Sequence, residues 1–235
     1  MAYFLIIETA TEVCSVALAQ DGRVIDLEET KEGQNHSRLV SVFAERLLLR
    51  NSVNPSELSA VGVSKGPGSY TGLRIGVSIA KGLCFASNIP LIAVGTLEAM
   101  ARHVAKNRND YDIPEDLPVL YCPMIDARRM EVFSALIAKD GEILKPVSAE
   151  VIGNEFLAEE LLTHRIIFFG NGSAKCKNVL SSPNAVFVSD INASAKYMGE
   201  LVWDAYNKRH FEDVAYFEPF YLKDFVATVS KKNML

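Results

Sequence analysis

The second half of the sequence repeats the first, and this repeat limits the possible folds more than any other feature. Residues 7–9 (Ile-Glu-Thr) have a counterpart in residues 125–127 (Ile-Asp-Ala). The Asp-Gly turn at 21–22 has a counterpart at 140–141. Because Asp-Gly turns are common, one repeated hairpin alone would not establish a duplication.

A glycine-rich turn also recurs, in the same order. Residues 66–69 (Gly-Pro-Gly-Ser) follow a predicted strand at 60–63, and residues 170–173 (Gly-Asn-Gly-Ser) follow one at 165–169. Two separate matches indicate a duplicated α/β unit, with a shorter connection between hairpin and turn in the second copy.

The first copy is predicted to begin with antiparallel strands. Apolar runs at 3–8 and 13–19 predict two strands, and the Asp-Gly pair leads into a third at 23–27. Helices and single strands then alternate: a helix from Ser37, a strand at 60–63, a helix through Phe85, a strand at 91–94 and a helix from Thr96.

A polar, proline-bearing stretch at 107–116 predicts the boundary between the copies. We therefore expect an N-terminal lobe at 1–110 and a C-terminal lobe at 111–235, whose last segment packs back on the first lobe. Three antiparallel strands followed by helix–strand alternation, twice over, is the plan of the actin-like (ribonuclease H-like, ASKHA) fold. The predicted fold class is α/β, with two lobes that each contain a mixed sheet beginning with an antiparallel hairpin.

In actin-like proteins nucleotide lies between the lobes, and an acidic residue in each hairpin turn holds phosphate and metal. Here the turns carry Glu8 and Asp126, which we expect to face each other across a vestigial nucleotide cleft with Thr9, Thr11 and Arg128. The first turn has no glycine, where phosphate-binding hairpins usually have one. We therefore expect no cofactor beyond weak binding of ATP or ADP. Arg128 either contacts an anion or lies on the surface.

The helix after the first glycine-rich turn carries an unusual stripe of small residues. Gly72, Gly76 and Ala80 are spaced four apart, so they share one helix face. Glycine inside a helix costs roughly 1 kcal/mol relative to alanine, and close approach of another backbone would offset that cost. The approaching backbone belongs either to a partner or to the same lobe.

Catalytic motifs are absent from the sequence. The four histidines, His36, His103, His164 and His210, show no metal-ligand spacing. Ser69 lies in Gly-Pro-Gly-Ser-Tyr, which is not a nucleophile elbow. The glycine-rich turn lacks the lysine of a P-loop. We expect no catalytic residue and no bound metal.

Composition limits the cellular compartments and the classes of partner that we expect for this chain. The net charge of -5 disfavours strong binding of nucleic acid by the chain alone, because phosphate contacts need clustered Lys and Arg. Four scattered cysteines suggest no disulfide framework, and no stretch is long enough to span a bilayer. We expect a cytoplasmic protein that does not bind membranes.

Five segments of the chain together resemble the bacterial TsaB (YeaZ) family: 7–11, 36–37, 65–76, 125–132 and 218–222. The resemblance covers nearly the whole chain. Its most specific part is Gly-Pro-Gly-Ser-Tyr-Thr-Gly-Leu-Arg-Ile-Gly at 66–76. Glu8 is a departure, since the family usually has Asp there, and its longer side chain would displace a water-mediated metal contact.

The resemblance implies a part in making threonylcarbamoyladenosine on tRNA, at the adenosine beside the anticodon. In that family the chain is a non-catalytic paralogue of TsaD, the enzyme that carries the metal and transfers the threonylcarbamoyl group. It implies binding to TsaD through first-lobe helices, an assembly that the ATPase TsaE joins, and a homodimer through the same surface when TsaD is absent. Transfer RNA is then contacted only through the complex.

Carried onto this chain, that partner surface lies on the helix from Ser37 and on the glycine-striped helix. Its predicted members are Leu39, Phe43, Leu47, Tyr70, Gly72, Leu73, Ile75, Gly76, Ile79, Ala80 and Leu83. The apolar residues among them are equally consistent with the core of the lobe. A competent actin-like ATPase or kinase, or a peptidase acting on a partner, are the alternative functions.

Overall fold

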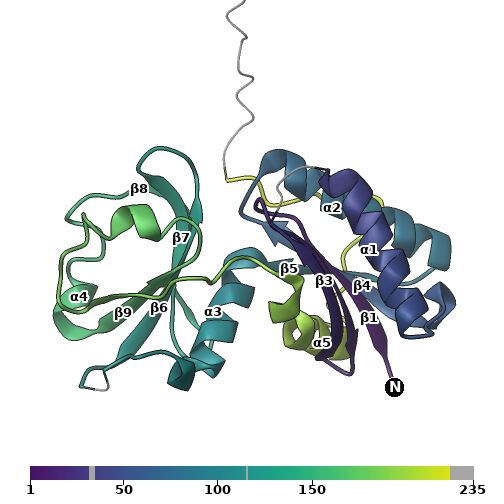
Figure 1. The fold of residues 1–235 in the computed structure, drawn as a ribbon, viewed down its shortest axis with the longest axis horizontal. Helices are drawn as coiled ribbons and strands as arrows, with labels where there is room; N and C mark the ends of the chain where they lie inside the picture. The colour runs from purple at the N-terminus through teal and green to yellow at the C-terminus, as the bar shows by residue number, and fades with distance from the viewer. Residues whose placement is uncertain (32–34, 115, 223–235) are drawn as a thin grey trace, which may run out of the picture.

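The computed structural model describes residues 1–31, 35–114 and 116–222. Within these ranges the chain forms two five-stranded mixed sheets that lie side by side (Figure 1). Residues 223–235, the last part of the predicted C-terminal lobe, lie outside the described residues.

The first sheet has the strand order β3-β2-β1-β4-β5. The first three strands are antiparallel, whereas β4 and β5 run parallel to β1. The bounds are β1 Tyr3–Glu8, β2 Cys14–Gln20, β3 Arg23–Thr30, β4 Leu58–Gly66 and β5 Leu91–Gly95.

The second sheet repeats this topology in the order β10-β9-β6-β7-β8. Strand β6 takes the place of β1, with an antiparallel neighbour on one side and a parallel neighbour on the other. The bounds are β6 Val119–Asp126, β7 Glu131–Ile137, β8 Ile143–Val151, β9 Arg165–Phe169 and β10 Ala185–Phe187. The duplicated actin-like fold predicted from the repeat is confirmed.

Helices cover the two sheets unequally. Helices α1 and α2 cover one face of the first sheet and α5 covers the other, while α3 packs mainly on β6 of the second sheet. On the opposite face of the second sheet, the short helix α4 and the loops around it replace two long helices (Figure 1). The bounds are α1 His36–Arg50, α2 Tyr70–Ser87, α3 Thr96–Lys106, α4 Glu160–Thr163 and α5 Gly199–Asn207, with short 3-10 turns η1 Pro55–Glu57, η2 Arg108–Asp110, η3 Ala174–Cys176 and η4 Ala195–Tyr197.

Strand β1 is the centre of the first lobe because its side chains alternate between two apolar cores. Leu5 and Ile7 pack under α1 and α2, whereas Phe4 and Ile6 pack toward α5. The Phe4 ring meets the ring of Trp203 edge-on, at a centroid distance of 5.9 Å. Full burial of such a side chain contributes about 2 kcal/mol to folding.

The segment after α5 runs along the first lobe. Glu212 forms an isolated antiparallel bridge with Leu91, and the backbone N–H of Phe220 donates to the carbonyl of Lys65 over 2.7 Å. The Lys81 ammonium donates to the carbonyl of Phe217. No helix in the described part of the chain is long and apolar enough to cross a membrane.

Candidate functional site

A cavity of about 940 Å³ lies between the two lobes. Its walls are the β1–β2 turn, the start of α2, the β6–β7 turn, the 170–173 loop and residues 220–222. This is the position at which the predicted vestigial cleft belongs. Of the residues predicted for it, Thr11, Asp126 and Arg128 line the cavity, whereas Glu8 and Thr9 lie behind its wall.

The glycine-rich turn is clamped onto the β1–β2 turn. A Cβ at Gly68 would lie 2.2 Å from the Ala10 carbonyl oxygen, so only glycine fits there. The Ser69 N–H donates to the same carbonyl, and the Ser69 hydroxyl accepts a hydrogen bond from the Gly72 N–H, which caps α2. These contacts fix where α2 begins relative to the cavity.

The glycine stripe of α2 packs against the same turn. A Cβ at Gly72 would lie 2.1 Å from the Thr9 carbonyl oxygen, and one at Gly76 would lie 2.3 Å from Thr9 Oγ1. The Thr9 hydroxyl donates to the Gly72 carbonyl over 2.8 Å. The backbone that approaches the stripe therefore belongs to the same lobe.

This packing corrects part of the predicted partner surface. The structure places six of its members inside the first lobe, where the chain itself covers them: Phe43, Leu47, Gly72, Leu73, Gly76 and Ala80. For them the core alternative holds, because side chains at this spacing face the sheet. The other five are only partly covered: Leu39, Tyr70, Ile75, Ile79 and Leu83. Their role in binding a partner stays a prediction.

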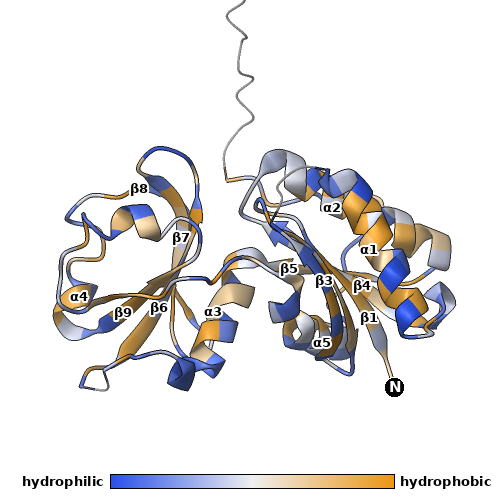
Figure 2. Cartoon of the chain, viewed as in Figure 1, coloured by the Kyte–Doolittle hydropathy of each residue, from blue (hydrophilic) through white to orange (hydrophobic). Residues whose placement is uncertain are grey.

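The sequence-based prediction of the partner surface did not include two further exposed apolar side chains. Phe85 of α2 is 85% exposed and Leu49 of α1 is 73% exposed. Phe85 lies on the same helix stripe as Arg74, Ser78 and Gly82, all of them exposed, and a large aromatic on such a stripe was the available signal. Apolar residues appear along both α1 and α2 in Figure 2.

The Glu8 carboxyl is turned into the protein instead of toward the cavity. It is 1% exposed and accepts a hydrogen bond from the Ala10 N–H over 2.7 Å. Burial raises the pKa of Glu8 from 4.5 to about 7, and the hydrogen bond from Ala10 opposes this rise. The hydroxyls of Ser64 and Thr96 lie beside the carboxyl and also favour ionisation, although within the described residues neither makes a regular hydrogen bond.

Asp126 is exposed at the cavity, so it alone of the two predicted carboxylates faces the cleft. The Lys175 ammonium forms an ion pair with it, and the Arg128 N–H donates to its Oδ1 over 3.1 Å. Arg128 has φ 73°, which is costly for a residue with a branched or long side chain and holds this turn tight. Much of the negative charge of Asp126 is thus already balanced by the chain.

One contact crosses the cavity and links the lobes. The Asn171 amide accepts from the Asp126 N–H through Oδ1 and donates through Nδ2 to Glu12 Oε2, each over 3.0 Å. Asn171 lies in the second glycine-rich loop and Glu12 in the β1–β2 turn. The repeat therefore places the two glycine-rich turns at one cleft. No three His, Cys, Asp or Glu side chains within ranges 1–31, 35–114 and 116–222 gather in a way that could hold a metal ion.

Two five-stranded sheets of the same topology, with a cavity between them, define a protein of the actin-like class. The family model of TsaD, tRNA N6-adenosine threonylcarbamoyltransferase, matches residues 29–231. The TsaB protein of Bacillus subtilis is 33% identical over 181 residues, which cover 75% of this chain and 74% of that one. The TsaB protein of Haemophilus influenzae is 28% identical over 239 residues and covers 94% and 93%.

A solved structure of YeaZ from Pseudomonas aeruginosa superposes with a TM-score of 0.76 at 23% identity, over 94% of this chain and 100% of that one. A second structure, of an uncharacterized protein with similarity to peptidase YEAZ from Pseudomonas aeruginosa, gives 0.81 at 22% identity over 95% and 100%. The chain belongs to the TsaB (YeaZ) family, whose curated members are tRNA threonylcarbamoyladenosine biosynthesis proteins.

Proposed function

We propose that this chain is a non-catalytic subunit that binds a TsaD-type transferase, together with the ATPase TsaE, for threonylcarbamoylation of the adenosine beside the anticodon. The observation that carries the proposal is the outer surface of α1 and α2. It leaves Leu39, Ile75, Ile79 and Leu83 partly exposed. Phe85, on another face of α2, is almost fully exposed. Exposed apolar residues gathered on neighbouring helices favour a protein interface.

The surroundings of the two cleft carboxylates favour a non-catalytic role for the chain. Phosphoryl chemistry in this fold needs carboxylates that can reach a metal-bound nucleotide. Glu8 is buried and hydrogen-bonded inside the first lobe, and Asp126 is paired with Lys175. Neither carboxylate is free to take that part without a rearrangement.

The charge of the chain supports an indirect contact with tRNA. At a net charge of -5, the protein as a whole repels the phosphate backbone. The proposed transferase partner would then supply the contacts to tRNA, while this chain positions or stabilises that partner.

The test is association with the TsaD protein of the same organism, measured by calorimetry with wild type and two variants. Ile79→Glu puts a charge on the proposed interface, and Leu162→Glu makes the same change on the second lobe at a side chain that is 80% exposed. A central interface residue is worth about 2 kcal/mol, so Ile79→Glu should weaken binding roughly thirtyfold. Leu162→Glu should bind like wild type.

The result against the proposal would be equal affinity of all three proteins, or loss of binding with Leu162→Glu alone. The same pair of variants addresses the proposed homodimer. If the isolated chain dimerises through the α1–α2 surface, sedimentation should show a dimer for wild type and Leu162→Glu and a monomer for Ile79→Glu.

A further inference from the structure

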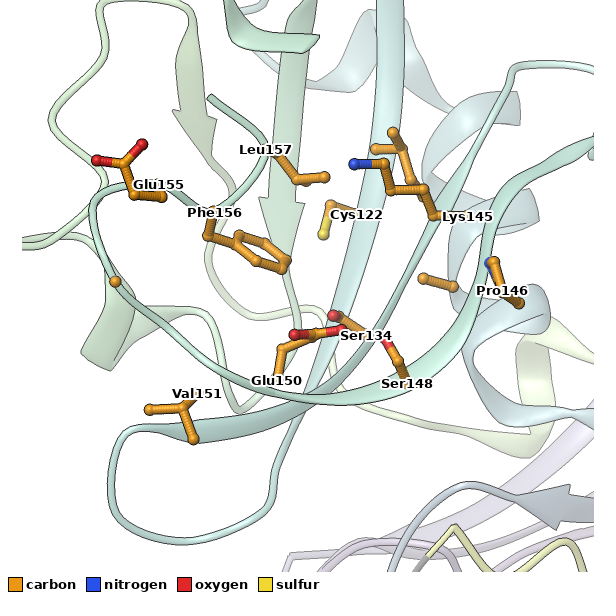
Figure 3. Close-up of a pocket in the computed structure, with 13 residues that line it drawn as sticks. Cys122, Ser134, Lys145, Pro146, Ser148, Glu150, Val151, Glu155, Phe156 and Leu157 are labelled. Atoms are coloured by element: carbon orange, nitrogen blue, oxygen red, sulfur yellow. The ribbon is translucent and has the colours of Figure 1, made fainter. Parts of the chain in front are cut away.

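A second pocket, of about 570 Å³, lies in the second lobe, away from the interlobe cavity (Figure 3). It opens on the face of the second sheet that corresponds to the α1–α2 face of the first sheet. There the segment from Gly153 to Leu157 replaces two long helices, and the hollow remains where helix side chains would otherwise pack. Pockets of this size are typical of small-ligand sites.

One wall of the pocket is polar. Ser134 of β7 pairs directly with Ser148 of β8, and Glu150 follows two residues later on the same face of the sheet. Figure 3 shows the two hydroxyl groups and the Glu150 carboxylate gathered on one side of the hollow.

These polar groups have no partner among the residues that the structure describes. Ser134 is only 2% exposed and lines the pocket, yet no hydrogen bond joins its hydroxyl to the described chain. The same holds for the hydroxyl of Ser148 and the carboxylate of Glu150. Ser134 is a buried residue, whereas Ser148 and Glu150 are half-exposed. The three groups therefore form an accessible polar wall whose hydrogen-bonding capacity is open to a polar ligand group.

The opposite wall is apolar. Phe156 and Leu157 face the hollow across from the polar groups, near the buried Cys122 (Figure 3). Leu136 also lines the pocket. Leu157 is held at φ 55°, a left-handed conformation that a leucine rarely adopts, and this places its side chain in the wall.

The charges around the pocket indicate which polar group a ligand would carry. The Lys145 ammonium at the rim forms an ion pair with Glu160 over 2.7 Å, so this pair is neutral. The Glu150 carboxylate is left without a counter-charge among the described residues. The pocket therefore favours a cation, and the several acceptor groups of the polar wall favour one with several donors.

We propose that this pocket binds a primary alkylammonium group. An ammonium has three N–H donors, which match the Ser134 hydroxyl, the Ser148 hydroxyl and the Glu150 carboxylate. The attached methylene chain would lie along Phe156 and Leu157 on the opposite wall. The same chemistry occurs in a polyamine and in the lysine side chain of a partner protein.

Binding is tested on the full chain by NMR titration, following the backbone amides of β7 and β8. The probes are pentylamine and pentan-1-ol, which share the alkyl chain but differ in the charged donor group. Pentylamine should shift these amides in a saturable way, and pentan-1-ol should bind far more weakly. Equal binding of the alcohol, or no shift at the solubility limit of the amine, overturns the proposal.

Two matched variants locate the interaction. Glu150→Gln should weaken pentylamine binding at least about tenfold, because it removes a charge-assisted hydrogen bond. Glu155→Gln is the control, since this residue lines the same pocket but Figure 3 shows its carboxylate turned outward. Equal weakening by both variants would show general attraction to acidic surface and refute the site. Melting curves of each variant verify that it is folded.

Two further probes identify the source of the group. Spermidine stands for polyamines, and a blocked Gly-Lys-Gly peptide stands for a lysine side chain of a partner. Each should compete with pentylamine at the same amides, and the tighter of the two indicates the natural source. Failure of both to compete would contradict the proposal.

Discussion

Replacement of Glu8 by glutamine should stabilise the protein, by an amount that grows as pH rises from 4.5 through 7. The carboxyl is buried, and its pKa rises from 4.5 in the unfolded chain to about 7 in the folded one. The folded state thus holds the proton more tightly than the unfolded state. Stability from this group is fully present below pH 4.5 and is lost as pH rises through 7.

The size of the effect follows from the two pKa values. The difference between 4.5 and about 7, at ~1.36 kcal/mol per pKa unit, corresponds to about 3 kcal/mol of lost stability at pH 8. Glutamine keeps the acceptor for the Ala10 N–H but carries no charge. Glu8→Gln should therefore be about 3 kcal/mol more stable than wild type at pH 8 and nearly equal to it at pH 4.5.

Urea denaturation at several pH values measures this difference. The control is Glu142→Gln, which removes a carboxylate from the exposed β7–β8 turn and should change little at any pH. A Glu8→Gln variant that is less stable than wild type at pH 8, or whose advantage does not depend on pH, would refute the reasoning. Such a result would mean that the charged carboxylate is solvated or paired in the folded protein.

Further predictions concern the stripe, the cleft and tRNA. Gly76→Leu should lower the free energy of unfolding by roughly 1–3 kcal/mol through overpacking against Thr9. Gly82→Leu is the control, because a Cβ there meets nothing within 4 Å. Thermal melting compares the two variants, and a Gly76→Leu variant as stable as wild type would show that the stripe does not pack against Thr9. Calorimetry of the chain alone with ATP and magnesium should give no low-micromolar binding, and such binding, if lost on Asp126→Ala, would revive the ATPase alternative. The isolated chain should not retain tRNA on filters, so a tight, salt-sensitive complex would contradict the charge argument.

The fold could be predicted because the two copies of the sequence repeat form two sheets of the same topology. The matching hairpins at 7–9 and 125–127 become β1–β2 and β6–β7, which occupy equivalent places in the two sheets. Such strands are continuous apolar runs, which a sequence displays directly.

The candidate site was less predictable because it depends on contacts between distant residues. The spacing of Gly72 and Gly76 shows that one helix face is bare, but not that Thr9, more than sixty positions earlier, fills it. For the same reason the inward turn of Glu8 could not be read from the motif. The hollow in the second lobe arises from a missing pair of helices, and only the assembled sheet shows the side chains left facing it.

The two lobes exchange helices, and this makes each dependent on the other. Helix α3 comes from the first half of the chain but packs mainly on β6, whereas α5 comes from the second half and packs on the first sheet. A fragment ending near residue 110 would carry α3 without β6, its main packing partner, and expose the Phe4 and Ile6 face of β1. Neither half is therefore a self-sufficient folding unit. Proteolysis or truncation between them should yield two insoluble pieces, and coexpression of both should restore a soluble protein.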